Sequence, residues 1–218
     1  MKIAIIGGTG KEGAGLALRW AAAGHEIIIG SRDAGRASAK AAELRAQTGS
    51  AAIAGESNRK AASLGSVIVL AVPWTGLDAT LPELREACRG KIVISTVVPL
   101  TFGGPRLFTP PPAGSAAEDA QRLLGEEARV VAAFHHVAAH ELAELGDLDS
   151  DLLLCGVDAD AKRVTTELGA SLGLRAIDVG PLSNAGPLEG LTAILATINR
   201  RYKITSSGIK ITGLQRSR

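Results

Sequence analysis

The chain has 218 residues, of which 46% are hydrophobic, and a formal net charge of +2. This length suits one large domain, or a full domain with a smaller addition, and is enough to bury a core. The 24 basic residues are dispersed and nearly balanced by 22 acidic ones, which gives no argument for nucleic acid or a membrane surface as a partner. No apolar run approaches the length of a membrane span, and the two cysteines have no motif spacing. We therefore expect a cytoplasmic protein.

Strand-like and helix-like patterns alternate along the chain. Short, fully apolar runs are typical of strands covered on both faces, and each is followed by a segment with helical periodicity. This alternation predicts an α/β fold with a doubly wound parallel sheet of the Rossmann type. We expect strands at residues 2–6, 25–30, 51–54, 67–72, 91–97, 129–134, 152–155 and 174–179. We expect helices at residues 10–23, 34–48, 57–64, 75–88, 115–124, 159–171 and 184–202.

The segment 99–114 interrupts this alternation with five prolines and three glycines. A loop of this length inside a compact domain is either functional or a connector. Ser115 and Glu118 follow it with the spacing of a capping box, which predicts the start of the next helix. We divide the chain into a dinucleotide-binding domain at residues 1–126 and a smaller α/β segment at residues 127–218 that completes a second pocket.

A glycine pattern follows the first predicted strand directly. Gly8, Gly10 and Gly13 have the spacing GxGxxG between an apolar run and a predicted helix, which is the dinucleotide fingerprint. The first glycine allows a tight turn, the second lets the backbone approach a pyrophosphate, and the third lets helix and strand pack closely. The pattern predicts a bound dinucleotide at the start of the chain.

The end of the second predicted strand indicates which dinucleotide binds. An NAD-binding protein usually has an acidic residue there, whereas this chain has Ser31, Arg32 and, one helical turn later, Arg36. A hydroxyl and two guanidinium groups suit a phosphate dianion, so we predict NADP. The alternative is that both arginines are ordinary surface residues, partly neutralised by Asp33.

The other unusual residues also follow predicted strands, where an open α/β sheet binds its ligands. Val72 and Val98 would suit the walls around a nicotinamide ring, although plain core packing explains either of them equally well. His135 follows the sixth predicted strand and is a candidate hydrogen-bond donor to a bound ring, or else a packed histidine. His136 should point the opposite way, because alternate residues of an extended segment do. His136 and His140 are four apart, but no further ligand is spaced to complete a metal shell, so we expect no metal.

Several catalytic patterns are missing. The only tyrosine, Tyr202, is near the end of the last predicted helix and is not part of a Tyr-x-x-x-Lys pattern. No paired carboxylates, nucleophile elbow or CxxC pair is present either. An NADP enzyme without an evident acid–base pair suggests a partner, such as a flavin-like ring, that exchanges hydride without help from a side chain.

Over nearly its whole length the chain resembles the NADPH-dependent reductases of the 8-hydroxy-5-deazaflavin coenzyme, F420. The similarity is carried by GGTGKEGAGLALRWAAAGHEIIIGSRD, VLAVPW, VVPL, the histidine segment at 135 and DVGPLSNAGPLEGLT. The resemblance implies reversible hydride transfer between NADP and F420, with the two rings face to face in one cleft.

The resemblance also implies residue roles. Those expected at the NADP pyrophosphate are Thr9, Gly10, Lys11 and Glu12; at the 2′-phosphate, Ser31, Arg32 and Arg36; and around the nicotinamide, Val72, Val98 and Ala138. Those expected to face the deazaflavin are His135 and Val137, with Asn184 and Thr192 nearby. The chain departs from some members of this family in having Gly186 in place of an arginine and Gly190 in place of a serine.

Two other functions remain open. An NADPH-dependent reductase of another flavin, a quinone or a metal chelate could use the same dinucleotide half. The chain could instead be an NADP-sensing protein that binds the cofactor without turnover. The apolar surface of the last predicted helix over residues 188–198 predicts a homodimer.

Overall fold

The computed structural model describes residues 1–104 and 106–214 of the chain. One eight-stranded sheet, with the order β3-β2-β1-β4-β5-β6-β7-β8, runs through it. Strands β1 to β6 are mutually parallel; β7 is antiparallel to β6, and β8 is parallel to β7. The predicted α/β fold is confirmed, with the parallel arrangement reversed at its last two strands. The strands are β1 Lys2–Ile6, β2 Glu26–Ser31, β3 Ile53–Ser57, β4 Val67–Leu70, β5 Ile92–Ser95, β6 Arg129–Ala133, β7 Asp151–Gly156 and β8 Arg175–Asp178.

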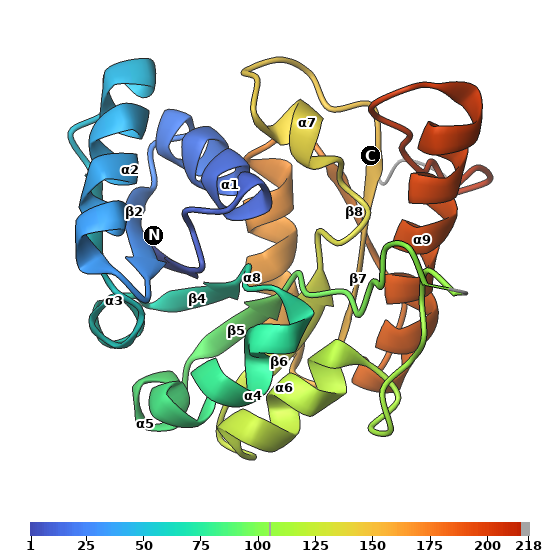
Figure 1. Ribbon diagram of the computed structural model, residues 1–218, viewed down its shortest axis with the longest axis horizontal. Coiled ribbons are helices and arrows are strands. Elements are labelled where there is room, and N and C mark those ends of the chain that lie inside the picture. Colours follow the sequence, from blue (N-terminus) through green and yellow to red (C-terminus); the bar gives the residue numbers. More distant parts are fainter. Residues whose placement is uncertain (105, 215–218) are drawn as a thin grey trace.

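Helices cover both faces of the sheet, and Figure 1 shows α1 and α2 on one side with α4, α5 and α6 on the other. One apolar core joins the sheet to α1, α2, α7 and α8, and a second joins it to α3, α4, α5, α6 and α9. This two-sided burial explains the continuous apolar strands. The helices are α1 Lys11–Ala22, α2 Ala34–Thr48, α3 Asn58–Leu64, α4 Leu77–Thr80, α5 Arg85–Cys88, α6 Ala116–Leu124, α7 Ala139–Leu142, α8 Ala159–Ala170 and α9 Ala185–Tyr202. None of these helices, within the described part of the chain, is long and apolar enough to cross a membrane.

The predicted helix at residues 75–88 is wrong as a single element. The segment is divided into α4 and α5, with short 3-10 turns at Trp74–Gly76 and Pro82–Leu84. Pro82 has no N–H to donate to the preceding turn and its ring collides with that turn, so the α-helix ends before it. The predicted capping box is confirmed, because the Glu118 N–H donates to Ser115 Oγ at 3.0 Å.

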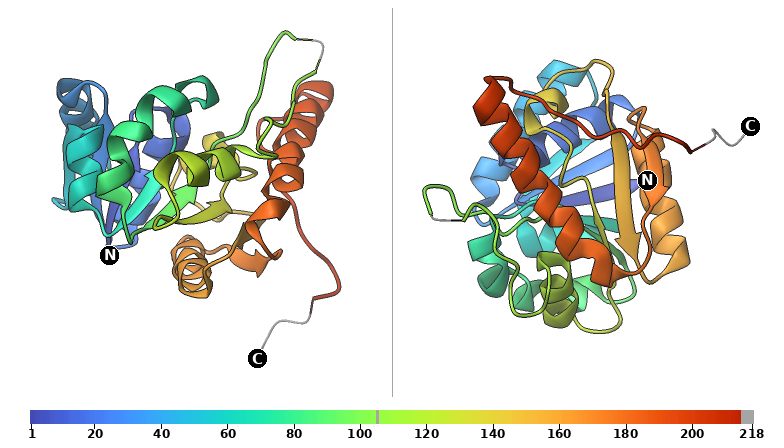
Figure 2. Two further views of the ribbon diagram at one scale, coloured as in Figure 1. Left: turned by 90° about the horizontal axis from the view of Figure 1, so that it is seen from below. Right: turned by 90° about the vertical axis from the view of Figure 1, so that its right-hand side faces the viewer.

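The loop between β5 and α6 forms a projecting hairpin. Leu100 and Phe108 make an antiparallel bridge, and the Thr101 N–H donates to the Leu107 carbonyl at 2.8 Å. Figure 2 shows this loop, in green, rising beside α9. Phe102 near its tip is 75% exposed. The base of the hairpin, rather than its tip, therefore lies near the sheet.

The predicted boundary at residue 126 falls between α6 and β6, and the sheet continues across it because β5 pairs with β6. The chain reverses after β6 through a tight turn. Phe134 has a left-handed φ of 68°, and the Val137 N–H donates to the Phe134 carbonyl at 3.0 Å. Strand β6 therefore ends one residue earlier than predicted, and β7 returns antiparallel beside it.

Candidate functional site

The fingerprint glycines form a compact turn between β1 and α1. Gly7 has a φ of +77°, and a Cβ on it would lie 2.8 Å from the Ala71 carbonyl oxygen. A Cβ on Gly13 would lie 2.8 Å from Gly8 Cα, so helix and turn pack in direct contact there. At Gly10 the nearest atom to such a Cβ is 3.5 Å away, which is an ordinary contact. The surroundings of Gly10 are thus open, as an approaching pyrophosphate requires.

Three further predicted pyrophosphate residues flank this opening. Thr9 is half-buried and Lys11 is exposed. Glu12 is in the first turn of α1, and its Oε1 is enclosed without a hydrogen-bond partner among the described residues. Burial raises the pKa of Glu12 to about 8. The Glu12 side chain is therefore neutral at pH 7 and adds no negative charge where phosphate would bind.

The end of β2 presents two free cations. The Asp33 carboxylate accepts hydrogen bonds from the N–H groups of Gly35 at 2.8 Å and Arg36 at 3.2 Å, which caps α2. Ser31 is buried, and its Oγ accepts from the Asp33 N–H at 3.3 Å. Arg32 and Arg36 are exposed, and no carboxylate of the described residues lies within 4.0 Å of either guanidinium group. Asp33 thus serves the helix cap and leaves the arginine side chains available.

The carboxyl ends of β1, β4 and β5 are joined by hydrogen bonds. The Ala71 N–H donates to Ile6 O at 2.9 Å, and the Thr96 N–H donates to Leu70 O at 3.1 Å. Val72 is buried and Val98 is half-buried just beyond these bonds. Both valines therefore lie on neighbouring strand ends at the same edge of the sheet as the fingerprint turn.

The two adjacent histidines after β6 have different surroundings. His135 is 6% exposed, and neither ring nitrogen has a partner among the described residues. Burial, with His136 as a smaller cause, lowers the pKa of His135 to about 3, so its ring is neutral and has one N–H to donate. His136 Nε2 lies 3.1 Å from Leu153 N and 2.9 Å from Asp151 O, which fixes this ring against β7.

The predicted extended conformation of the histidine segment is wrong. Residues 134–137 form a turn, so the two rings differ through the left-handed Phe134 rather than through strand alternation. His140 is exposed on α7. Across the described ranges, no group of three potential metal ligands is present.

Helix α9 is tied to the histidine turn. The Thr192 hydroxyl donates to the His135 carbonyl at 3.0 Å. In the same turn Val137 is buried and Ala138 is half-buried. Asn184 is exposed and donates to Val179 O at 2.6 Å. It precedes Thr192 by eight residues, which is about 12 Å along a helix. The structure thus brings Thr192 to His135 and leaves Asn184 away from it, just before the start of α9.

Sequence reasoning missed Glu189, which joins α9 to α6. Its carboxylate is fully buried and accepts hydrogen bonds from the N–H groups of Ala116 at 2.9 Å and Ala117 at 3.0 Å. Burial raises the pKa of Glu189 to about 7, although both backbone bonds oppose the shift. A buried glutamate in a helix pattern gives no sequence signal for a partner more than seventy residues away.

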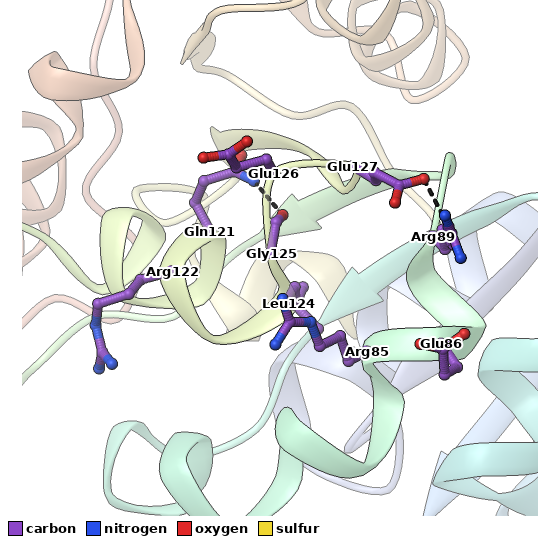
Figure 3. Close-up of a pocket in the computed structure, with 9 residues that line it drawn as sticks. All are labelled: Arg85, Glu86, Arg89, Gln121, Arg122, Leu124, Gly125, Glu126 and Glu127. Carbon is purple, nitrogen blue, oxygen red and sulfur yellow. Dashed lines mark hydrogen bonds and ion pairs between the residues drawn. The ribbon is translucent and has the colours of Figure 1, made fainter.

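A separate open pocket lies at the opposite edge of the sheet, between α5 and α6. Figure 3 shows Arg89 paired with Glu127, at 2.6 Å, and Arg122 pointing away from the other residues. Its three arginines are matched by three glutamates, so it has no excess charge with which to select an anion. The pocket is lined by Arg85, Glu86, Arg89, Gln121, Arg122, Leu124, Gly125, Glu126 and Glu127. It faces away from every predicted site residue.

The fold and the strand-end geometry define a Rossmann-type dinucleotide-binding protein. The family model described as NADP oxidoreductase, coenzyme F420-dependent, matches residues 2–99. The F420-dependent NADP reductase of Methanocaldococcus jannaschii is 42% identical over 99% of this chain and 100% of its own length. That of Methanothermobacter thermautotrophicus is 41% identical over 98% and 96%. The chain therefore belongs to the coenzyme F420-dependent NADP oxidoreductase family.

A solved structure agrees with this assignment. A protein of Arthrobacter sp. FB24, assigned as an F420-dependent NADP reductase, superposes with a TM-score of 0.85 and 27% identity, covering 97% of this chain and 99% of that one. A Sinorhizobium meliloti structure of 28% identity has a TM-score of 0.67. The Sinorhizobium comparison covers 86% of this chain and 88% of that one, so both likenesses extend well beyond residues 2–99.

Proposed function

We propose that the protein catalyses reversible hydride transfer between NADP(H) and coenzyme F420. The observation that supports this most strongly is the edge formed by the ends of β1, β4, β5 and β6. It joins an open turn at Gly10 to apolar walls at Val72 and Val98 and to His135, whose buried ring nitrogens have no partner among the described residues. Family membership then identifies the second coenzyme.

The residues at this edge fit NADP. Lys11 and Glu12 provide backbone N–H groups at the start of α1, where the helix dipole favours a pyrophosphate, while the Gly10 N–H donates to the Gly7 carbonyl. Arg32 and Arg36 supply guanidinium donors for the 2′-phosphate, with Ser31 beside them. Val72, Val98 and Ala138 would border the nicotinamide, and residues 127–218 would complete the pocket for the deazaflavin.

When both are bound, the coenzymes supply the hydride donor and acceptor. The chain holds the two rings at reacting distance and excludes water, and such positioning can supply about 7–11 kcal/mol of barrier lowering. The ring of His135 is neutral, and its nitrogens have no partner in the described part of the chain, so it can donate one hydrogen bond to a ring that becomes more negative. Thr192 holds the His135 backbone in place.

The direct test mixes the purified protein with NADPH and oxidised F420 and follows the visible absorbance of F420. Bleaching at a rate proportional to enzyme supports the proposal. NADPH binding with no turnover on any acceptor would identify a sensor. Turnover only with another flavin, a quinone or a metal chelate would identify a different reductase.

We also propose a cytoplasmic homodimer associated through α9. Two large hydrophobic side chains are exposed on this helix, Ile194 at 55% and Tyr202 at 67%, and a second copy of the chain could cover them. Cys88 and Cys155 are free and buried, as a reducing compartment allows. Light scattering after gel filtration measures the mass, and Ile194→Glu should reduce a dimer to a monomer.

A further inference from the structure

The base of the hairpin between β5 and α6 lies on the cleft side of the sheet. The chain enters this hairpin just after Val98, beyond the end of β5, and returns from it to the start of α6 at the same edge of the sheet. Because Leu100 bridges Phe108, the tip projects away and the base faces the strand ends (Figure 2). Phe108, half-buried at this base, is therefore much closer to Val98 than the exposed Phe102 is.

Helix α9 approaches this loop through two glycines four residues apart. A Cβ on Gly186 would lie 2.8 Å from the Gly114 carbonyl oxygen, so no side chain fits there. A Cβ on Gly190 would lie 3.5 Å, 3.7 Å and 4.0 Å from three ring carbons of Phe108. The Phe108 ring thus takes the volume in front of Gly190 that a longer side chain would need.

The other flank of the same helix turn carries the histidine contact. Thr192, which bonds the His135 carbonyl, is two residues beyond Gly190, or about 200° around a helix. Ala193 points between these two directions and is half-buried. One turn earlier on α9, the Glu189 carboxylate accepts hydrogen bonds from the first N–H groups of α6, so α6 packs against this part of the helix. His135 and Phe108 therefore lie on either side of the part of α9 that carries Ala193 and, one turn earlier, Glu189.

We propose that Phe108 is a positioning and specificity-determining residue for the second coenzyme, whose flat ring system it contacts from the side opposite His135. This inference rests on the proposed function and adds a residue to its second site. The Phe108 ring packs against the helix at Gly190 and is only half-buried, so part of its surface is available to another flat ring, and such pairs favour offset or edge-to-face contact. Gly190 provides the space that this ring position needs.

The test compares Phe108→Ala with Phe102→Ala, which removes the exposed aromatic of the same loop. Steady-state assays give the KM for oxidised F420 and for NADPH, and thermal unfolding gives the Tm. We expect Phe108→Ala to raise the KM for F420 about three- to tenfold, the range of an aromatic pair contact, with the KM for NADPH unchanged. Phe102→Ala should match the wild type in all three measurements.

Two more variants separate ring contact from loop packing. Phe108→Leu keeps most of the apolar volume but lacks a flat face, so the KM for F420 should stay raised. Gly190→Val keeps Phe108 and displaces its ring, and should raise the same KM. The inference is overturned if Leu restores the wild-type KM, if both KM values rise together, or if Phe108→Ala behaves like Phe102→Ala. A wild-type protein inactive with F420 would instead overturn the proposed function on which the inference depends.

Discussion

Selection of NADPH over NADH should depend on Arg32. Its guanidinium group follows β2 without a carboxylate partner among the described residues, and Asp33 is engaged by the cap of α2. A hydrogen bond to a charged group contributes about 1.5–3 kcal/mol, and the exposure of Arg32 argues for the lower end. We expect Arg32→Ala to raise the KM for NADPH about tenfold, since about 1.4 kcal/mol corresponds to a factor of ten.

The assay measures KM for NADPH and for NADH with F420 as acceptor at fixed ionic strength. NADH lacks the 2′-phosphate, so its KM should change by less than about twofold, within the scatter of a surface substitution. Lys40→Ala on the outer face of α2 is the matched control, because Lys40 pairs with Glu43. Equal losses for both coenzymes in Arg32→Ala would refute the assignment of Arg32 to the 2′-phosphate.

Three further predictions concern the turn, the buried glutamate and the histidines. Gly10→Ala should keep the wild-type Tm but weaken NADPH binding. Gly13→Ala should lower the Tm measured by calorimetry, because its Cβ would clash with Gly8 Cα. Because the pKa of Glu12 is raised to about 8, its contribution to the free energy of unfolding is full below about pH 4.5 and is lost as the pH rises through about 8. Glu12→Gln should flatten that loss in unfolding titrations from pH 4 to 9.5, and should also remove the weakening of NADPH binding that we expect above pH 8. His135→Ala should lower turnover while leaving NADPH binding intact, and the increase in the activation barrier should be less than the ~2.7–4 kcal/mol of an oxyanion-hole donor. His136→Ala should instead lower the Tm, because it loses the ring contacts to β7. The reverse pattern would contradict both assignments.

The parallel part of the fold could be predicted because its signals are local. Apolar runs mark strands β1, β2, β4, β5 and β6, and the bounds of α2 at Ala34–Thr48 agree with its sequence pattern. Strand β3, Ile53–Ser57, has no such run, and its prediction at residues 51–54 overlaps it by only two residues. The reversal at β7 could not be predicted, since its direction is set by the path of residues 134–150, which includes α7 and a left-handed Phe134 that the sequence does not signal. Pro82 is a local signal in the sequence that a helix ends before it, and the prediction of one continuous helix at residues 75–88 gives that signal too little weight.

The candidate site likewise has one part that local sequence signals predict and another part that they do not. Residues at strand ends, such as Arg32 and Val98, follow from the topology rule for open sheets and needed no long-range knowledge. Contacts between distant segments had no sequence signal. Thr192 meets His135 across 57 positions, and Phe108 meets Gly190 only because α9 and the hairpin pack together. Even the enclosure of Glu12 depends on such packing, because its position in the fingerprint suggests an exposed side chain.

The central claim is direct hydride transfer between the two coenzymes in one water-excluding cleft. The measurement is a single turnover of NADPH deuterated at both C4 positions with oxidised F420 in ordinary water, followed by mass spectrometry of the reduced F420. Direct transfer predicts that the reduced F420 carries one deuterium from NADPH. Reduced F420 without deuterium, or no reduction of F420 at all, would contradict it.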